Sequence, residues 1–196
     1  MRTFLTPLAL ATTLLVGAAA PAWADFWDGI AAYEAGDYAT ALKEFRPLAA
    51  QGHVLSQNNL GAMYFDGRGV PQDDAEAMKW WHKAAEQGNA PAQYNLALMY
   101  DTGEGVPQDY AAAVKWYRLA AEQGYAFGQS NLGVMYGNGQ GVPLNNIKAY
   151  MWWALAKAQG DEKAAGNLDI VKSQMTAADI SEAQRLASEM WEKIND

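Results

Sequence analysis

The chain lacks cysteine and has only two histidines among its 196 residues. Without thiols it can form neither disulfides nor thiolate metal sites, so apolar packing must hold the fold together. A lipoprotein needs a cysteine at its cleavage point, so we expect no membrane anchor of that kind. His53 and His82 fall in different phases of the repeat described below, which argues against a convergent metal site. We therefore expect no metal and no cofactor.

Basic residues and long apolar segments are also scarce. Against 22 Asp and Glu stand only 14 Lys and Arg, for a net charge of −8. Phosphate backbones and anionic lipids repel such a chain, so nucleic acid is not an expected partner. The apolar segment 4–16 is too short to span a membrane. It lies between Arg2 and Ala22-Trp23-Ala24, an arrangement typical of a cleaved secretory signal peptide.

This pattern predicts that residues 1–24 are removed and that the mature chain starts at Asp25. We accordingly expect a periplasmic or secreted protein.

Signatures of common catalytic sites are missing as well. The chain has no Ser-x-x-Lys, no Gly-x-Ser-x-Gly and no His-Glu-x-x-His, so the usual means of activating a serine or a zinc-bound water lack their residues. Asp101-Thr102-Gly103 resembles an aspartic-protease loop only in its letters, because the other copies of this turn read Asp-Gly and Asn-Gly. We expect no catalytic residues. An enzyme acting on peptidoglycan or a β-lactam stays as an alternative.

What the sequence does contain is a 36-residue period in three residue classes. The positions that keep it are Val70-Pro71, Val106-Pro107 and Val142-Pro143; Tyr64, Tyr100 and Tyr136; Trp80, Trp116 and Trp152; and Gly52, Gly88, Gly124 and Gly160. A period of this length marks stacked supersecondary units, each of which buries its apolar face against its neighbours. The predicted fold is an all-α solenoid of helix-turn-helix repeats, with about ten helices and no strands.

Each repeat is predicted to hold two helices, A and B. A glycine-rich turn such as 137–143 ends helix A. Asp73, Asp109 and Asn145 are N-caps for helix B, and the periodic glycines end it. The predicted units are an N-terminal capping hairpin (25–52), three repeats (53–88, 89–124, 125–160) and C-terminal capping helices (161–196). In the last unit we expect a helix from 162 to about 174, then a capping box that begins a final helix at Thr176.

Three segments resemble the Sel-1-like repeat family, relatives of tetratricopeptide repeats with a longer glycine-rich turn. They are 95–100 (Asn-Leu-Ala-Leu-Met-Tyr), 103–110 (Gly-Glu-Gly-Val-Pro-Gln-Asp-Tyr) and 113–124, with near copies one period to either side. The resemblance covers roughly residues 26 to 174. It implies a right-handed α-solenoid that serves as a scaffold for protein or peptide partners. The hairpin 25–52 is closer to an ordinary tetratricopeptide unit.

An aromatic pair recurs on helix B as Trp80-Trp81, Trp116-Tyr117 and Trp152-Trp153. We expect the first ring of each pair, in phase with Ala77 and Ala84, to pack against helix A. The second ring is then expected between repeats or at the surface. If exposed, Trp81, Tyr117 and Trp153 give a further alternative function, that of a carbohydrate-binding module.

Helix A is the predicted site of partner binding, because it is expected to line the concave face. Leu60, Leu96 and Leu132 are its invariant core, whereas the outer positions differ between copies. The predicted partner-binding residues are Leu55, Asn58, Asn59, Pro91, Tyr94, Asn95, Leu98, Phe127, Ser130, Asn131 and Val134.

Among these residues, only the asparagines at 59, 95 and 131 do not vary. Such a ladder either hydrogen-bonds the backbone of an extended peptide or ties neighbouring repeats together. The sequence therefore favours a monomeric, non-catalytic scaffold for a protein or peptide.

Overall fold

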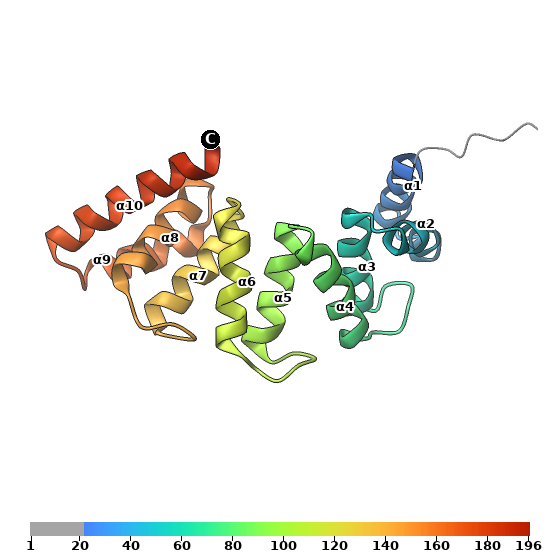
Figure 1. The fold of residues 1–196 in the computed structure, drawn as a ribbon, viewed down its shortest axis with the longest axis horizontal. Helices are drawn as coiled ribbons and strands as arrows, with labels where there is room; N and C mark the ends of the chain where they lie inside the picture. Colours follow the sequence, from blue (N-terminus) through green and yellow to red (C-terminus); the bar gives the residue numbers. More distant parts are fainter. Residues whose placement is uncertain (1–21) are drawn as a thin grey trace, which may run out of the picture.

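The computed structural model describes residues 22–196, and this part of the chain forms ten α-helices and no strand (Figure 1). The helices are α1 (Ala22–Glu34), α2 (Tyr38–Ala50), α3 (Val54–Asp66), α4 (Asp74–Glu86), α5 (Ala90–Thr102), α6 (Tyr110–Glu122), α7 (Ala126–Asn138), α8 (Asn146–Ala158), α9 (Glu162–Lys172) and α10 (Ala177–Asn195). The predicted all-α repeat fold is confirmed. The predicted signal peptide lies outside the described residues except for its last three, which form the first turn of α1.

Four helical hairpins stack side by side in chain order, α1 with α2 through α7 with α8 (Figure 1). Helix α9 packs on α8 as an unpaired helix of type A, and α10 crosses back over α8. Ile194, near the end of α10, lies against Gly124 in the turn between α6 and α7. The last helix therefore covers the open end of the stack.

The predicted caps define both ends of each helix B. Asp73, Asp109 and Asn145 accept hydrogen bonds from backbone N–H groups three residues ahead, at 3.0, 2.9 and 2.9 Å. At the other end of α4, Gly88 has a φ of 88°, and the N–H of Asn89 donates to the carbonyl of Ala84 at 3.1 Å. This is a Schellman motif, in which glycine supplies the left-handed conformation.

The glycine-rich turn between helices A and B packs on the preceding repeat. A Cβ atom at Gly141 would lie only 2.3 Å from the carbonyl oxygen of Tyr110, the first residue of α6. Its φ of 68° is also left-handed, so this position accepts glycine alone. The turn is therefore part of the interface between repeats.

The predicted phase of the aromatic pairs is wrong. The second ring is buried in every repeat, with Trp81, Tyr117 and Trp153 only 4%, 0% and 7% exposed, whereas the first ring is partly exposed at Trp80 and Trp116 and is buried only at Trp152. The Nε1 of Trp81 donates to the carbonyl of Asn58 on helix A at 3.1 Å. Trp116 is half-buried and meets His82 of the preceding repeat edge to face, with ring centroids 5.6 Å apart.

Small residues on helix A explain this phase. A Cβ atom at Gly61 would lie 2.6 Å from the ring of Trp81, and one at Gly133 would lie 2.6 Å from the ring of Trp153. The equivalent residue of the middle repeat is Ala97, and there the ring is the smaller Tyr117. The second ring thus fills the space left by a missing or short side chain on helix A.

A buried glutamine in each repeat joins helices of two units, and the sequence analysis missed it. The side chains of Gln57, Gln93 and Gln129 donate to the carbonyls of Ala49, Ala85 and Ala121 near the end of the preceding helix B, at 3.1, 3.1 and 3.2 Å. Each also accepts from the glutamine that ends its own helix B: Gln87, Gln123 and Gln159. Both the nitrogen and the oxygen of each buried amide thus have a partner inside the stack, as is typical of buried polar groups.

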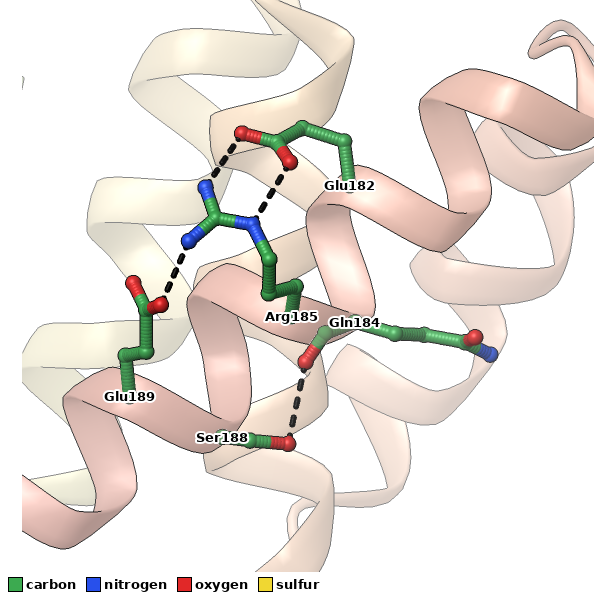
Figure 2. Close-up of polar contacts among 5 residues, drawn as sticks. All are labelled: Glu182, Gln184, Arg185, Ser188 and Glu189. Carbon is green, nitrogen blue, oxygen red and sulfur yellow. Dashed lines mark hydrogen bonds and ion pairs between the residues drawn. The ribbon is translucent and has the colours of Figure 1, made fainter.

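Helix α10 carries an exposed cluster of charged side chains, whose contacts are drawn in Figure 2. Arg185 pairs with Glu182 at 2.6 Å and also with Glu189 on the next turn. The inner face of α10 buries Ala183 in the core shared with α8. At the start of the helix, Thr176 and Asp179 form the predicted capping box. The α10 helix is therefore a solvated cap of the apolar stack.

Candidate partner-binding surface

The residues predicted to bind a partner all lie on α3, α5 and α7. Leu55 and Phe127 are the most exposed of them, at 48% and 57%, and Ser130 is buried. The others are partly exposed: Asn58, Asn59, Pro91, Tyr94, Asn95, Leu98, Asn131 and Val134.

Three hollows follow these helices from α3 to α9, and we call the surface that they form the A-face. The first, of about 240 Å³, lies between α3 and α5 and is lined by Asn95 and Leu98, with Trp81 among its other residues. The second, of about 370 Å³, is lined by Tyr94, Phe127, Ser130 and Asn131 together with residues 160–163. The third, of about 240 Å³, is lined by Val134 and residues of α8 and α9. Seven of the eleven predicted residues thus line hollows, and Leu55, Asn58, Asn59 and Pro91 do not.

Three aromatic rings cluster beside the second hollow. The ring centroids of Tyr94, Tyr125 and Phe127 lie 5.6, 5.7 and 5.9 Å from one another. Tyr117 lies 5.9 Å from Tyr94 on the core side. Burial raises the pKa of the Tyr94 and Tyr125 hydroxyls above the ordinary value, so both rings stay neutral.

Tyr125 departs from the repeat in a way that concerns this cluster. The equivalent residues His53, Asn89 and Asp161 cap their helices through side-chain hydrogen bonds, whereas Tyr125 makes no such bond to α7. A good N-cap stabilises a helix by about 1 kcal/mol. At this one position the chain therefore has an aromatic ring in place of a cap.

Charge is divided between the two kinds of helix. Helices α3, α5 and α7 contain no Lys or Arg, whereas α2, α4, α6 and α8 contain two each. The A helices do carry carboxylates, Asp66 on α3 and Asp101 on α5. Asp66 pairs with Arg68 at 3.2 Å, but Glu104, Asp161 and Glu162 also line the three hollows, against Lys163 as the one basic residue in their walls, so the A-face is acidic.

Asp101 lies partly buried behind the A-face. Burial raises the pKa of its carboxyl group, and a hydrogen bond from the Tyr117 hydroxyl, at 3.1 Å, opposes that rise. Phe65 and Gly137 take its place in the other repeats, so this carboxylate is particular to the middle unit.

The asparagine ladder is not what ties the repeats together. Within residues 22–196 the side chains of Asn59 and Asn95 form no hydrogen bond to other protein groups, and Asn131 lies beside the Tyr94 hydroxyl, where it opposes the rise of the Tyr94 pKa. The buried glutamines make the connection between repeats instead. The amides of Asn59 and Asn95 are therefore available to a ligand.

A larger hollow, of about 450 Å³, lies away from the A-face between α8 and α10, where Leu155 and Ala187 line it beside the exposed Trp191. None of the predicted residues lies there. In the described part of the chain no group of three or more His, Cys, Asp or Glu side chains is placed to hold a metal ion. Nor is any helix from 22 onward both long and apolar enough to cross a membrane.

Stacked helical hairpins with buried links between units define an α-solenoid repeat protein. The Sel1 repeat family matches residues 54–89, 90–125 and 126–161 of the chain, over more than half of its length. The chain belongs to the Sel1 repeat family. Among curated proteins there is no significant match.

Two solved structures are similar to the chain. One is a Sel1 repeat protein from Oxalobacter formigenes, 36% identical over 74% of this chain, with a TM-score of 0.71. The other is c5321, a protective antigen present in uropathogenic Escherichia coli strains and displaying an SLR fold, 36% identical over 89% of this chain, with a TM-score of 0.76. The chain spans 60% and 38% of the length of these two proteins.

Proposed function

We propose that the chain is an exported, non-catalytic scaffold that binds a protein or peptide partner along the A-face. The observation that carries this proposal is the row of three hollows lined by positions that vary between repeats. The core leucines of the same helices do not vary. Surface residues that differ between otherwise equal units are typical of a surface shaped for one ligand.

Two further features support an extended peptide as the ligand. The unpaired amides of Asn59 and Asn95 are spaced one repeat apart and offer both donors and acceptors to a peptide backbone. Phe127 is a large apolar side chain left 57% exposed beside a hollow, as interface anchors often are. Binding of this kind needs no cofactor, and a monomer suffices for it.

The export part of the proposal rests on the sequence of residues 1–24. Its charged start, short apolar segment and Ala-x-Ala site are typical of a signal peptide. A periplasmic or secreted location follows from that signature.

A simple assay distinguishes the proposed scaffold from the alternative of an envelope-acting enzyme. Purified protein incubated with nitrocefin or with muropeptides should give no turnover. The carbohydrate-binding alternative has lost its basis, because the rings that it required, Trp81, Tyr117 and Trp153, are buried.

Selection from a random dodecapeptide library displayed on phage tests the proposed surface. We expect the double variant Tyr94→Ala with Phe127→Ser to weaken the selected peptides by about 2 kcal/mol or more, because interface anchors contribute energies of that size. The matched control is Leu119→Ser with Leu144→Ala, which removes two exposed apolar side chains that line none of the three hollows. Peptides that bind both variants as tightly as the native chain would place the binding surface elsewhere.

A further inference from the structure

We infer that the second hollow of the A-face receives a lysine or arginine side chain of the partner. This inference rests on the proposed function and adds to it the chemistry of the bound segment. The hollow, of about 370 Å³, has aromatic rings on one side and the start of α9 on the other. Both sides favour a cation.

The α9 side of the hollow carries two carboxylates. Asp161 and Glu162 line it, with Lys163 as one opposing charge, so the net charge of this wall is negative. One oxygen of Asp161 accepts from the N–H of Ala164 at 2.9 Å, whereas the other has no hydrogen-bond donor within residues 22–196. The positive end of the α9 dipole is thus already met by its own carboxylates and does not call for an anion.

The other side of the hollow is formed by π-systems. Tyr94 and Phe127 line it, and Tyr125, the residue just before α7, packs against both of these rings. The face of an aromatic ring carries negative potential and attracts an ammonium or guanidinium group within about 6 Å. A basic side chain with a long aliphatic stem would meet apolar rings along the stem and carboxylates at its charged end.

The missing cap at Tyr125 is an independent sign of function. Helices α3, α5 and α9 keep a capping side chain at this position, whereas α7 has a ring there that packs in the aromatic cluster. A position that gives up a stabilising cap without an evident structural gain is more often part of a functional site.

The distribution of charge between the A and B helices also favours a basic ligand. Because the A helices of all three repeats lack Lys and Arg, a positively charged segment meets no repulsion along α3, α5 and α7. The acidic chain as a whole also attracts such a segment from a distance.

The experiment uses the selected dodecapeptides and the variant Asp161→Asn with Glu162→Gln. Asparagine still caps α9, so this variant removes two charges and keeps the helix start. The matched control is Asp73→Asn with Asp74→Asn, which removes the same two charges from the N-cap and first position of α4. Affinity is measured by fluorescence anisotropy on the full chain.

We expect the α9 variant to weaken the peptides about tenfold and the α4 control to leave them nearly unchanged. Replacing one basic peptide residue with the neutral isostere citrulline or norleucine should cause the same loss, and the two losses should not add. Peptides that need Tyr94 and Phe127 but tolerate both neutral changes would overturn this inference and leave the proposed function standing. Peptides indifferent to Tyr94 and Phe127 would instead overturn the proposed function itself.

Discussion

Gln123 donates its side-chain amide to the Oε1 of Gln93 at 2.7 Å, from the last turn of α6 to the buried face of α5. Since Gln93 also donates to the carbonyl of Ala85 on α4, one side chain connects three helices of two repeats. The same arrangement occurs around Gln57 and Gln129. Directional bonds thereby fix the register that apolar packing alone would leave adjustable.

Replacing Gln93 by alanine should therefore lower the free energy of unfolding by about 2 to 3 kcal/mol, because the link between the helices is lost and a cavity forms, although the carbonyl of Ala85 still accepts from the N–H of Gly88. Gln123→Ala, at an exposed position, should cost about 1 kcal/mol or less. Urea unfolding followed by circular dichroism measures both. Equal small losses in the two variants would show that the buried amide link contributes little.

The two aromatic positions of helix B should differ sharply. Tyr117 is fully buried, so Tyr117→Ala should cost about 3 to 5 kcal/mol, as for other buried large aromatics. Trp116→Ala should cost clearly less, because its side chain is only partly buried. Thermal melts of the two variants side by side decide this, and the reverse order would contradict the packing described here.

Adding one methyl group beside the ring of Trp153 should be costly. The Cβ of Gly133→Ala would meet this ring at 2.6 Å, and overpacking of this kind costs about 1 to 3 kcal/mol. Combining it with Trp153→Tyr should recover part of the loss, since the middle repeat already pairs alanine with tyrosine. A double-mutant cycle in urea measures the coupling. Strictly additive effects would mean that the two positions do not share space.

Acidification should destabilise the chain partly through His82. Burial, assisted by Lys115 and opposed by Glu86, lowers the pKa of this imidazole below its ordinary value. The unfolded chain then binds the proton at a higher pH than the folded chain, so stability is complete above the unfolded pKa and is lost as the pH falls through the folded one. His82→Gln should flatten the dependence of the urea midpoint on pH between 7.5 and 5.5. Parallel curves for the two proteins would contradict this.

Export should leave a defined N-terminus. The intact mass of protein recovered from the periplasm or medium should correspond to residues 25–196. Cleavage after Ala24 would shorten α1 by its first turn. It would keep the buried Phe26, whose ring centroid lies 5.8 Å from that of Phe45. An uncleaved chain retained in the cytoplasm would refute the predicted location.

The helices were predictable because the fold is encoded in short, repeated signals. Val-Pro pairs, N-cap residues such as Asp109 and C-terminal glycines such as Gly124 each act within a few residues of where they stand. The capping box at Thr176 acts in the same way. Such signals do not depend on which helix packs against which.

The phase of the aromatic pairs was not predictable from helix B alone. Both Trp80 and Trp81 lie three or four residues from Ala77 and Ala84, so helical periodicity fits either ring. Which of the two rings packs against helix A depends on Gly61, which lies on a different helix. Reading this glycine together with Gly133 opposite the large rings, and Ala97 opposite the smaller one, would have given the correct phase.

The hollows and the glutamine links depend on contacts between repeats. Gln93 in isolation looks like any solvated residue of helix A, and its partners lie 8 residues before it and 30 residues after it. The cluster around Tyr94 likewise joins residues of two A helices. Only the variation at 94 and 127, visible when the copies are aligned, indicated this region.

The folding back of α10 over α8 limits how such a chain can lengthen in evolution. Its end reaches the turn at Gly124, so a repeat added after α10 would find that side of α8 already covered. Duplication within the array meets no such obstacle, because the junctions after Gly88 and Gly124 present the same Schellman turn and the same pair of glutamines. A unit inserted in the middle would therefore lengthen the acidic A-face by one more asparagine and leave both ends as they are.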